Sequence, residues 1–193
     1  MRCHHMVYEV VASELQGRAA STVSTTGRVQ RSLRHWIPSL VGWVTCNADG
    51  SFRDVTGGAI CGRVLHNHHG EWIVGFTRSI DIYYAIEAEL RGIYECLKYA
   101  WELGVDRLRL ESDCGRAIQA LKDRKVRHDI SIVHHIWDLL DKQWEAHLLV
   151  IRQDNNKVVD SLAHLAWDLS FGFHDFIDPS SSISSLVLVD VLG

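Results

Sequence analysis

The chain has 193 residues, of which 47% are hydrophobic and 23% are charged, and its formal net charge is −4 at pH 7. This composition is typical of a globular protein, and the length is sufficient to bury a core without disulfide support. No apolar run approaches the roughly 20 residues of a membrane-spanning helix, so we expect no membrane partner.

The five cysteines are widely spaced and include no Cys-x-x-Cys pair. This spacing favours reduced thiols in an intracellular compartment, nucleus or cytoplasm, over a disulfide framework or a zinc site. Residues 15–42 are rich in Arg, Ser and Thr and contain no acid, so organelle import stays open as an alternative.

Hydrophobic periodicity divides the chain into one domain with two flanking segments. We expect a poorly ordered N-terminal arm over residues 1–40, a domain over 41–169, and a loosely attached C-terminal tail over 170–193. The domain is predicted to contain five strands, over residues 43–48, 57–66, 71–77, 107–112 and 147–152. It is predicted to contain four helices, over residues 82–103, 114–122, 130–144 and 157–169. This order indicates a monomeric α/β domain whose mixed five-stranded sheet is covered by helices.

Two aspartates lie where predicted strands end. Asp49 begins an Asp-Gly turn dipeptide after the first strand, and Asp113 follows the fourth strand. Ligand sites gather at the carboxyl ends of parallel strands, so the two side chains converge if these strands are parallel neighbours.

Two further acids lie on predicted helices. Glu89 follows Ile86 by three residues and precedes Ile93 by four, so it faces the buried stripe of its helix, where a carboxylate needs a partner, a metal or a proton. Asp160 lies in the first turn of the last helix.

Each acid has a simpler interpretation. Asp49 suits a turn and Asp113 an N-cap, Asp160 complements a helix dipole, and Glu89 could pair with an arginine. The four together, in this order of elements, favour a shared site.

The segments around these acids resemble ribonuclease H, most closely the plant type related to retrotransposon reverse transcriptases. The resemblance rests on Cys46-Asn47-Ala48-Asp49-Gly50-Ser51, Glu87-Ala88-Glu89-Leu90, Leu110-Glu111-Ser112-Asp113 and Asn156-Lys157-Val158-Val159-Asp160-Ser161-Leu162-Ala163, and it covers about residues 36–167. It implies a ribonuclease H-like fold and a metal-dependent endonuclease that hydrolyses the RNA strand of RNA/DNA hybrids.

The resemblance also implies a site of four carboxylates, Asp49, Glu89, Asp113 and Asp160, that holds two Mg²⁺ ions, with Mn²⁺ as an alternative. In the site that the resemblance implies, Asp49 bridges both ions. Glu89 and Asp113 hold one ion, and Asp160 holds the other ion. We expect Gly50 and Ser51 to contact the substrate, because selecting RNA requires a partner for its 2′-hydroxyl, although Ser51 also suits a turn.

One position departs from the family pattern. Active relatives carry a histidine about ten residues before the last aspartate, where this chain has Val150. His147 lies three residues upstream and cannot be assumed to substitute for it. The hypothesis is therefore a slow enzyme, and the alternative is a weak or inactive nucleic-acid-binding domain derived from a retrotransposon.

Overall fold

A computed structural model describes residues 39–53, 58–81, 84–124, 130–179 and 183–184, so the expected N-terminal arm lies almost wholly outside the described residues. The strands are β1 Val44–Arg53, β2 Gly58–His66, β3 Trp72–Asp81, β4 Arg107–Ser112, β5 Glu145–Val150 and β6 Phe173–Phe176. The helices are α2 Ala85–Glu102, α3 Gly115–Lys122, α4 Ser131–Leu140, the short 3-10 helix η1 Gln153–Asn155 and α5 Lys157–Ala166. None of the described helices is both long enough and apolar enough to cross a membrane.

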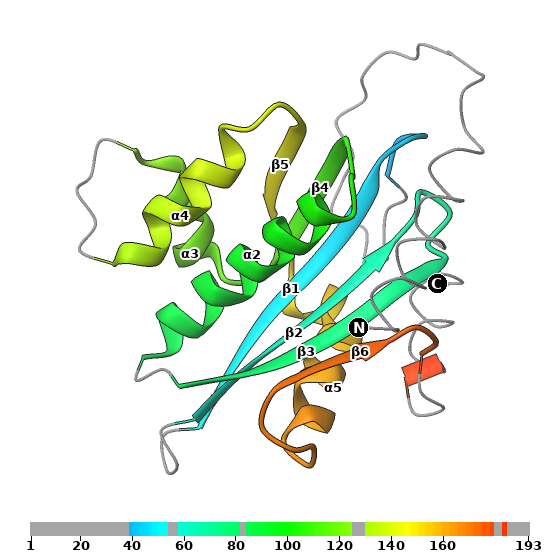
Figure 1. Cartoon of the computed structure of the whole chain (residues 1–193), viewed down its shortest axis with the longest axis vertical. Helices are drawn as coiled ribbons and strands as arrows, with labels where there is room; N and C mark the ends of the chain where they lie inside the picture. Colours follow the sequence, from blue (N-terminus) through cyan, green and yellow to red (C-terminus); the bar gives the residue numbers. More distant parts are fainter. Residues whose placement is uncertain (1–38, 54–57, 82–83, 125–129, 180–182, 185–193) are drawn as a thin grey trace.

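The strands form one mixed sheet in the order β5-β4-β1-β2-β3-β6 (Figure 1). β1 pairs in parallel with β4, and β4 pairs in parallel with β5, whereas the β1-β2-β3 meander and β6 are antiparallel. The predicted α/β class and mixed sheet are confirmed. The parallel neighbours β1 and β4 are the pair that the convergence of Asp49 and Asp113 requires.

The sheet has six strands rather than the predicted five. The sixth, β6, comes from the segment that we expected to be a loose tail, and it pairs with β3 from Gly75↔Phe176 to Arg78↔Phe173. The sequence of β6 is too short and too polar to show the alternation that identifies a strand. It forms a strand because the edge of β3 offers backbone N–H and C=O groups for pairing.

Helices cover both faces of the sheet (Figure 1). On one face, the apolar stripe of α2, which includes Leu90, Ile93 and Leu97, packs in the main core together with Leu108 and Leu110 of β4. On the other face, Val159 and Leu162 of α5 pack against Val64 of β2. The sheet therefore fixes α2 and α5, which carry two of the predicted site acids, relative to β1.

Strand β1 does not end at the Asp-Gly dipeptide, so the predicted turn there is wrong. Asp49 pairs with Gly62 and Gly50 with Cys61, and the antiparallel ladder continues to Arg53↔Gly58. The turn propensity of Asp-Gly is local, and the backbone hydrogen bonds offered by β2 override it. Only the parallel pairing with β4 stops before Asp49, its last partners being Asn47 and Glu111.

Two of the widely spaced cysteines meet in the fold. The side chains of Cys46 of β1 and Cys96 of α2 are in contact across the main core, with their Cα atoms 6.7 Å apart. Packing brings together two residues that are 50 positions apart, which spacing alone does not show. Cys61 and Cys114 are free.

Gly62 allows the closest approach of α5 to the sheet. A Cβ atom at this position would lie 2.8 Å from the Val159 carbonyl oxygen and 3.0 Å from the Ala163 nitrogen, both of them backbone atoms. We expect Gly62→Ala to lower the free energy of unfolding by about 1–3 kcal/mol, because overpacking forces backbone shifts. Urea denaturation measures the change.

Gly92→Ala is the matched control for this substitution. Its Cβ atom would have only ordinary contacts, the nearest with the Asp49 carbonyl oxygen at 3.4 Å, and alanine favours the helix. We expect Gly92→Ala to be neutral or stabilising. Equal losses in the two variants would contradict the tight contact at Gly62.

Candidate metal centre

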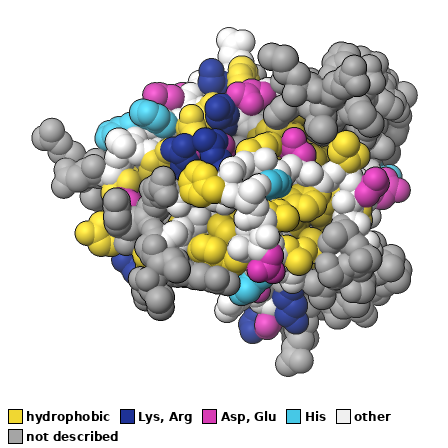
Figure 2. Space-filling view, turned by 60° about the horizontal axis from the view of Figure 1, so that its bottom comes forward, with side chains coloured by type: hydrophobic (Ala, Val, Ile, Leu, Met, Phe, Trp, Pro, Cys, Tyr) yellow, Lys and Arg dark blue, Asp and Glu magenta, His cyan; other side chains and the backbone are white. Residues whose placement is uncertain are grey.

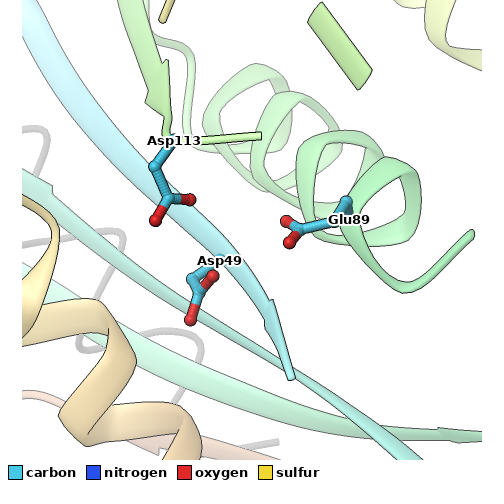
Figure 3. A group of neighbouring side chains, drawn as sticks. All are labelled: Asp49, Glu89 and Asp113. Carbon is cyan, nitrogen blue, oxygen red and sulfur yellow. The ribbon is translucent and has the colours of Figure 1, made fainter. Parts of the chain in front are cut away.

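Three of the four predicted acids meet at one point. Asp49 of β1, Glu89 of α2 and Asp113, which follows β4, each place a carboxylate oxygen within 4.8 Å of the others (Figure 3). Asp113 does not act as the N-cap of α3, since that position belongs to Cys114. The fold therefore brings together three acids that are far apart in the sequence, and their role in a site stays a prediction.

Gly50 sets the distance between β1 and α2. A Cβ atom there would lie 2.6 Å from the Ala88 carbonyl carbon and from the Glu89 nitrogen, so any side chain would push the helix away. The Gly50 N–H donates a 3.1 Å hydrogen bond to Glu89 Oε2. The Asp-Gly dipeptide therefore serves close packing and the orientation of Glu89, rather than a turn.

The acids repel one another and are partly removed from water. Burial raises the pKa of Glu89 to about 8, with the charges of Asp49 and Asp113 adding to the effect and the Gly50 N–H opposing it. Burial likewise raises the pKa of Asp49 to about 6, helped by Asp113 and Asp160. Without a cation, the site therefore holds protons at neutral pH.

Asp160, the fourth predicted acid, lies outside the group of three. It is half-buried in the first turn of α5, and its charge contributes to the raised pKa of Asp49. Its Oδ1 lies 3.3 Å from Nδ1 of His164, one helical turn further along. Asp160 is therefore near enough for its charge to act on Asp49, although it lies outside the group of three.

The sequence analysis missed the role of Asn156. It is the N-cap of α5 but makes no side-chain capping hydrogen bond. Its Nδ2 instead donates a 3.3 Å hydrogen bond to the carbonyl oxygen of Ala48, which precedes Asp49. The same residue's carbonyl oxygen accepts from the Asp160 N–H at 3.0 Å. Asn156 therefore ties the backbone beside Asp49 to the helix that carries Asp160.

A buried polar network supports β1 and β4 just before the acids. Asn47 Nδ2 donates to Glu111 Oε2 at 3.0 Å, and Asn47 Oδ1 lies 3.0 Å from Nε2 of His66. His66 is buried, and burial lowers its pKa to about 4. A neutral His66 can share hydrogen bonds with Asn47, which fixes the register of the strands.

The remaining predicted positions lie beside the acids. Ser51 is half-buried and follows Gly50 on β1, and its contact with a substrate stays a prediction. Val150 is 52% exposed and pairs with Ser112, the residue before Asp113. His147 pairs with Arg109, three positions back, and stacks on Trp43 at 4.6 Å between ring centroids. His147 therefore does not occupy the position of the missing histidine.

The donor set suits a hard divalent cation. All three converging groups offer carboxylate oxygens, which Mg²⁺ and Mn²⁺ accept as ligands, and no thiol or imidazole belongs to the group found among the described residues. A bound cation would relieve the repulsion that keeps protons on Glu89 and Asp49. The site residues therefore fit a metal of this class.

The chain has a mixed sheet with helices on both faces, and acids meet where the pairing of β1 with β4 ends. These features define a ribonuclease H-like domain. A family model described as reverse transcriptase-like matches residues 47–166, and the chain belongs to this family. A protein of Arabidopsis thaliana that carries a ribonuclease H name is 37% identical over 171 residues, which is 88% of this chain. The chain spans only 27% of the length of that relative.

Solved structures share the fold. The N-terminal RNase H domain of a Mycobacterium tuberculosis protein matches with a TM-score of 0.59 and 24% identity, covering 65% of this chain and 94% of that one. RNase H1 of Halobacterium salinarum matches with a TM-score of 0.59 and 22% identity, covering 65% and 98%. LC11-RNase H1, solved in complex with an RNA/DNA hybrid, matches with a TM-score of 0.59 and 16% identity, covering 65% and 96%.

The raised pKa of Glu89 predicts how stability depends on pH when metal is chelated. The folded state binds this proton more tightly than the unfolded state, so its contribution is complete below pH 4.5 and is lost as pH rises toward about 8. Glu89→Gln carries no charge and should lose less stability than the wild type between pH 5 and pH 8. Urea denaturation in EDTA measures both losses.

Glu87→Gln is the control for this experiment, because Glu87 is a half-buried acid two residues away on the same helix. It should keep the wild-type pH dependence. The same pH dependence in the Glu89 and Glu87 variants would contradict the proposed proton on Glu89.

Proposed function

We propose that this chain is a metal-dependent endonuclease that hydrolyses the RNA strand of RNA/DNA hybrids. The observation that carries the proposal is the convergence of Asp49, Glu89 and Asp113, with the charge of Asp160 acting on the same site. Such a group of acids is unfavourable unless cations bind it, and phosphodiester hydrolysis is a reaction that bound Mg²⁺ promotes. The ribonuclease H name of the Arabidopsis relative and the hybrid bound by LC11-RNase H1 support this substrate class.

The protein residues would bind and orient the reactants. Asp49, Glu89 and Asp113 would hold one Mg²⁺, and Asp49 would share a second with Asp160. When bound, the ions supply an activated water and stabilise the leaving oxygen. Glu89 must lose its proton to bind metal, and its hydrogen bond from the Gly50 N–H favours the charged form. Ser51 would contact the 2′-hydroxyl that distinguishes RNA from DNA.

We expect positive side chains to supply contacts for the phosphates of the substrate. Figure 2 shows that many of the visible Lys and Arg side chains gather in one part of this face, whereas Asp and Glu are more scattered. A negative net charge of −4 therefore does not prevent local attraction of nucleic acid. We infer a monomer that acts inside the cell.

A cleavage assay with Asp49→Asn tests the function. The wild type should cut labelled RNA in an RNA/DNA hybrid when Mg²⁺ or Mn²⁺ is present, and it should leave duplex DNA intact. Asp49→Asn should lower the rate by at least about 10²-fold, because it removes a ligand from the metal site. Asp168→Asn, which removes an exposed charge after α5, should keep the wild-type rate. Equal rates for the wild type and Asp49→Asn would contradict the proposed site.

A binding module with little or no catalysis is the second candidate, and Val150 is the observation that favours it. The exposed valine stands where active relatives carry a histidine, so a group for proton transfer or product release is missing. Binding of the hybrid without cleavage by the wild type in Mg²⁺ and Mn²⁺ would support this candidate over the enzyme.

Introducing the histidine tests whether its loss slows the reaction. Val150 is exposed at the end of β5, so Val150→His should be tolerated by the fold. It should raise kcat by up to about 10²-fold, since general acid–base groups contribute rate factors of this order. Single-turnover and steady-state rates on a hybrid separate an effect on chemistry from one on release.

His147→Ala is the control for this substitution. It should leave kcat unchanged, because His147 lies three positions before Val150 and contacts Trp43 and Glu145. A large loss of kcat in His147→Ala, together with no gain in Val150→His, would show that His147 already supplies the missing function.

A further inference from the structure

A second concave site lies on the α2 face, between α2 and the start of β6. It is an open cavity of about 420 Å³, a size within the roughly 300–1,000 Å³ of small-molecule sites. Residues of α2, of the end of β3 and of the 171–173 segment line it. The 171–173 segment lies beyond residues 47–166, which the family model matches, so this part of the lining is added to the matched region.

Aromatic rings form one wall of the cavity. Phe171 is 71% exposed and Phe173 is 36% exposed, whereas Tyr99 beside them is buried. The Phe173 ring centroid lies 5.6 Å from that of Phe76 and 6.2 Å from that of Tyr99. A cluster of rings therefore extends from the core to the surface and ends in exposed rings against which a planar group can stack.

Cations form the opposite wall. Arg78 and Arg91 lie 2.9 and 3.1 Å from the same oxygen, Oε1 of Glu95, and Lys98 lines the cavity beside them. Glu102 also lines the cavity, and its Oε1 lies 3.9 Å from Lys98 Nζ, so the two lining cations face two lining acids. The side chains of Arg78 and Lys98 are 37% and 43% exposed, so both can contact a phosphate that enters the cavity.

We propose that this cavity binds one unpaired nucleotide of a nucleic-acid strand, with its base against Phe171 and Phe173 and its phosphate on Arg78 and Lys98. Aromatic rings beside cations are the combination that binds single strands irrespective of sequence. The proposal deepens the proposed function and rests on it for the identity of the polymer.

The cavity lies two strands from the strand that carries Asp49. Arg78 pairs with Cys61, and Cys61 pairs with Gly50. With about 4.8 Å between neighbouring strands, this separation is roughly 10 Å through the sheet. Because α2 covers Gly50 and Cys61, a strand bound at the carboxylates would reach the cavity around this helix.

Binding of a fluorescent thymidine octanucleotide tests the proposal by anisotropy, with EDTA present so that no metal takes part. The full chain should bind the probe, and Phe171→Ala should weaken binding by about 5- to 100-fold, since stacking contributes about 1–3 kcal/mol per base. Lys98→Gln should also weaken binding and reduce its salt dependence. Leu169→Ala, which removes an exposed apolar side chain two residues from Phe171, should bind as the wild type does.

Two results would overturn the proposal. One is the absence of measurable binding by the full chain. The other is a Phe171→Ala variant with wild-type affinity, even if Lys98→Gln binds more weakly, because this would show charge attraction without a base site.

The Asp49→Asn variant separates the cavity proposal from the endonuclease proposal, since it should stop cleavage and retain octanucleotide binding. Binding without cleavage by the wild type would refute the endonuclease alone, and cleavage with unchanged binding in Phe171→Ala would refute the cavity alone.

Discussion

The approach of α2 to β1 at Gly50 is the constraint on which the metal centre depends. Backbone atoms of Ala88 and Glu89 occupy the space that a side chain at residue 50 would need. This contact places the Glu89 carboxylate beside Asp49 and Asp113, and the Gly50 N–H orients it. The free energy for holding like charges together comes from the apolar packing of α2 on the sheet.

Two buried sets of polar contacts position β4 and α5 relative to β1. Asn47 links Glu111 to His66, so β1 and β4 stay in register up to the point where the acids begin. Asn156 uses its side chain on the Ala48 carbonyl rather than on its own helix, which fixes α5 and hence Asp160 relative to β1. Both connections are buried, so loss of either partner would leave a polar group without a hydrogen bond.

The segment after α5 adds a cavity to the surface of the domain. β6 pairs with β3, and the exposed Phe171, just before β6, and Phe173, at its start, line one cavity with Arg78 and Glu95. The family fold supplies the sheet and α2, and this addition turns their outer edge into a cavity. The metal centre and the cavity thus share α2, which carries both Glu89 and Lys98.

The sequence by itself determined the α/β class, the helical stripe of α2, strand β4 to the residue, and the acids of the site, because these depend on local periodicity and residue type. It did not determine the course of β1 through Asp49-Gly50, the pairing of β6, the Cys46–Cys96 contact or the tether from Asn156. Those features join segments that are distant in the chain, so only the tertiary structure decides them. Local propensity is worth about 1 kcal/mol per residue, and long-range pairing and packing readily exceed it.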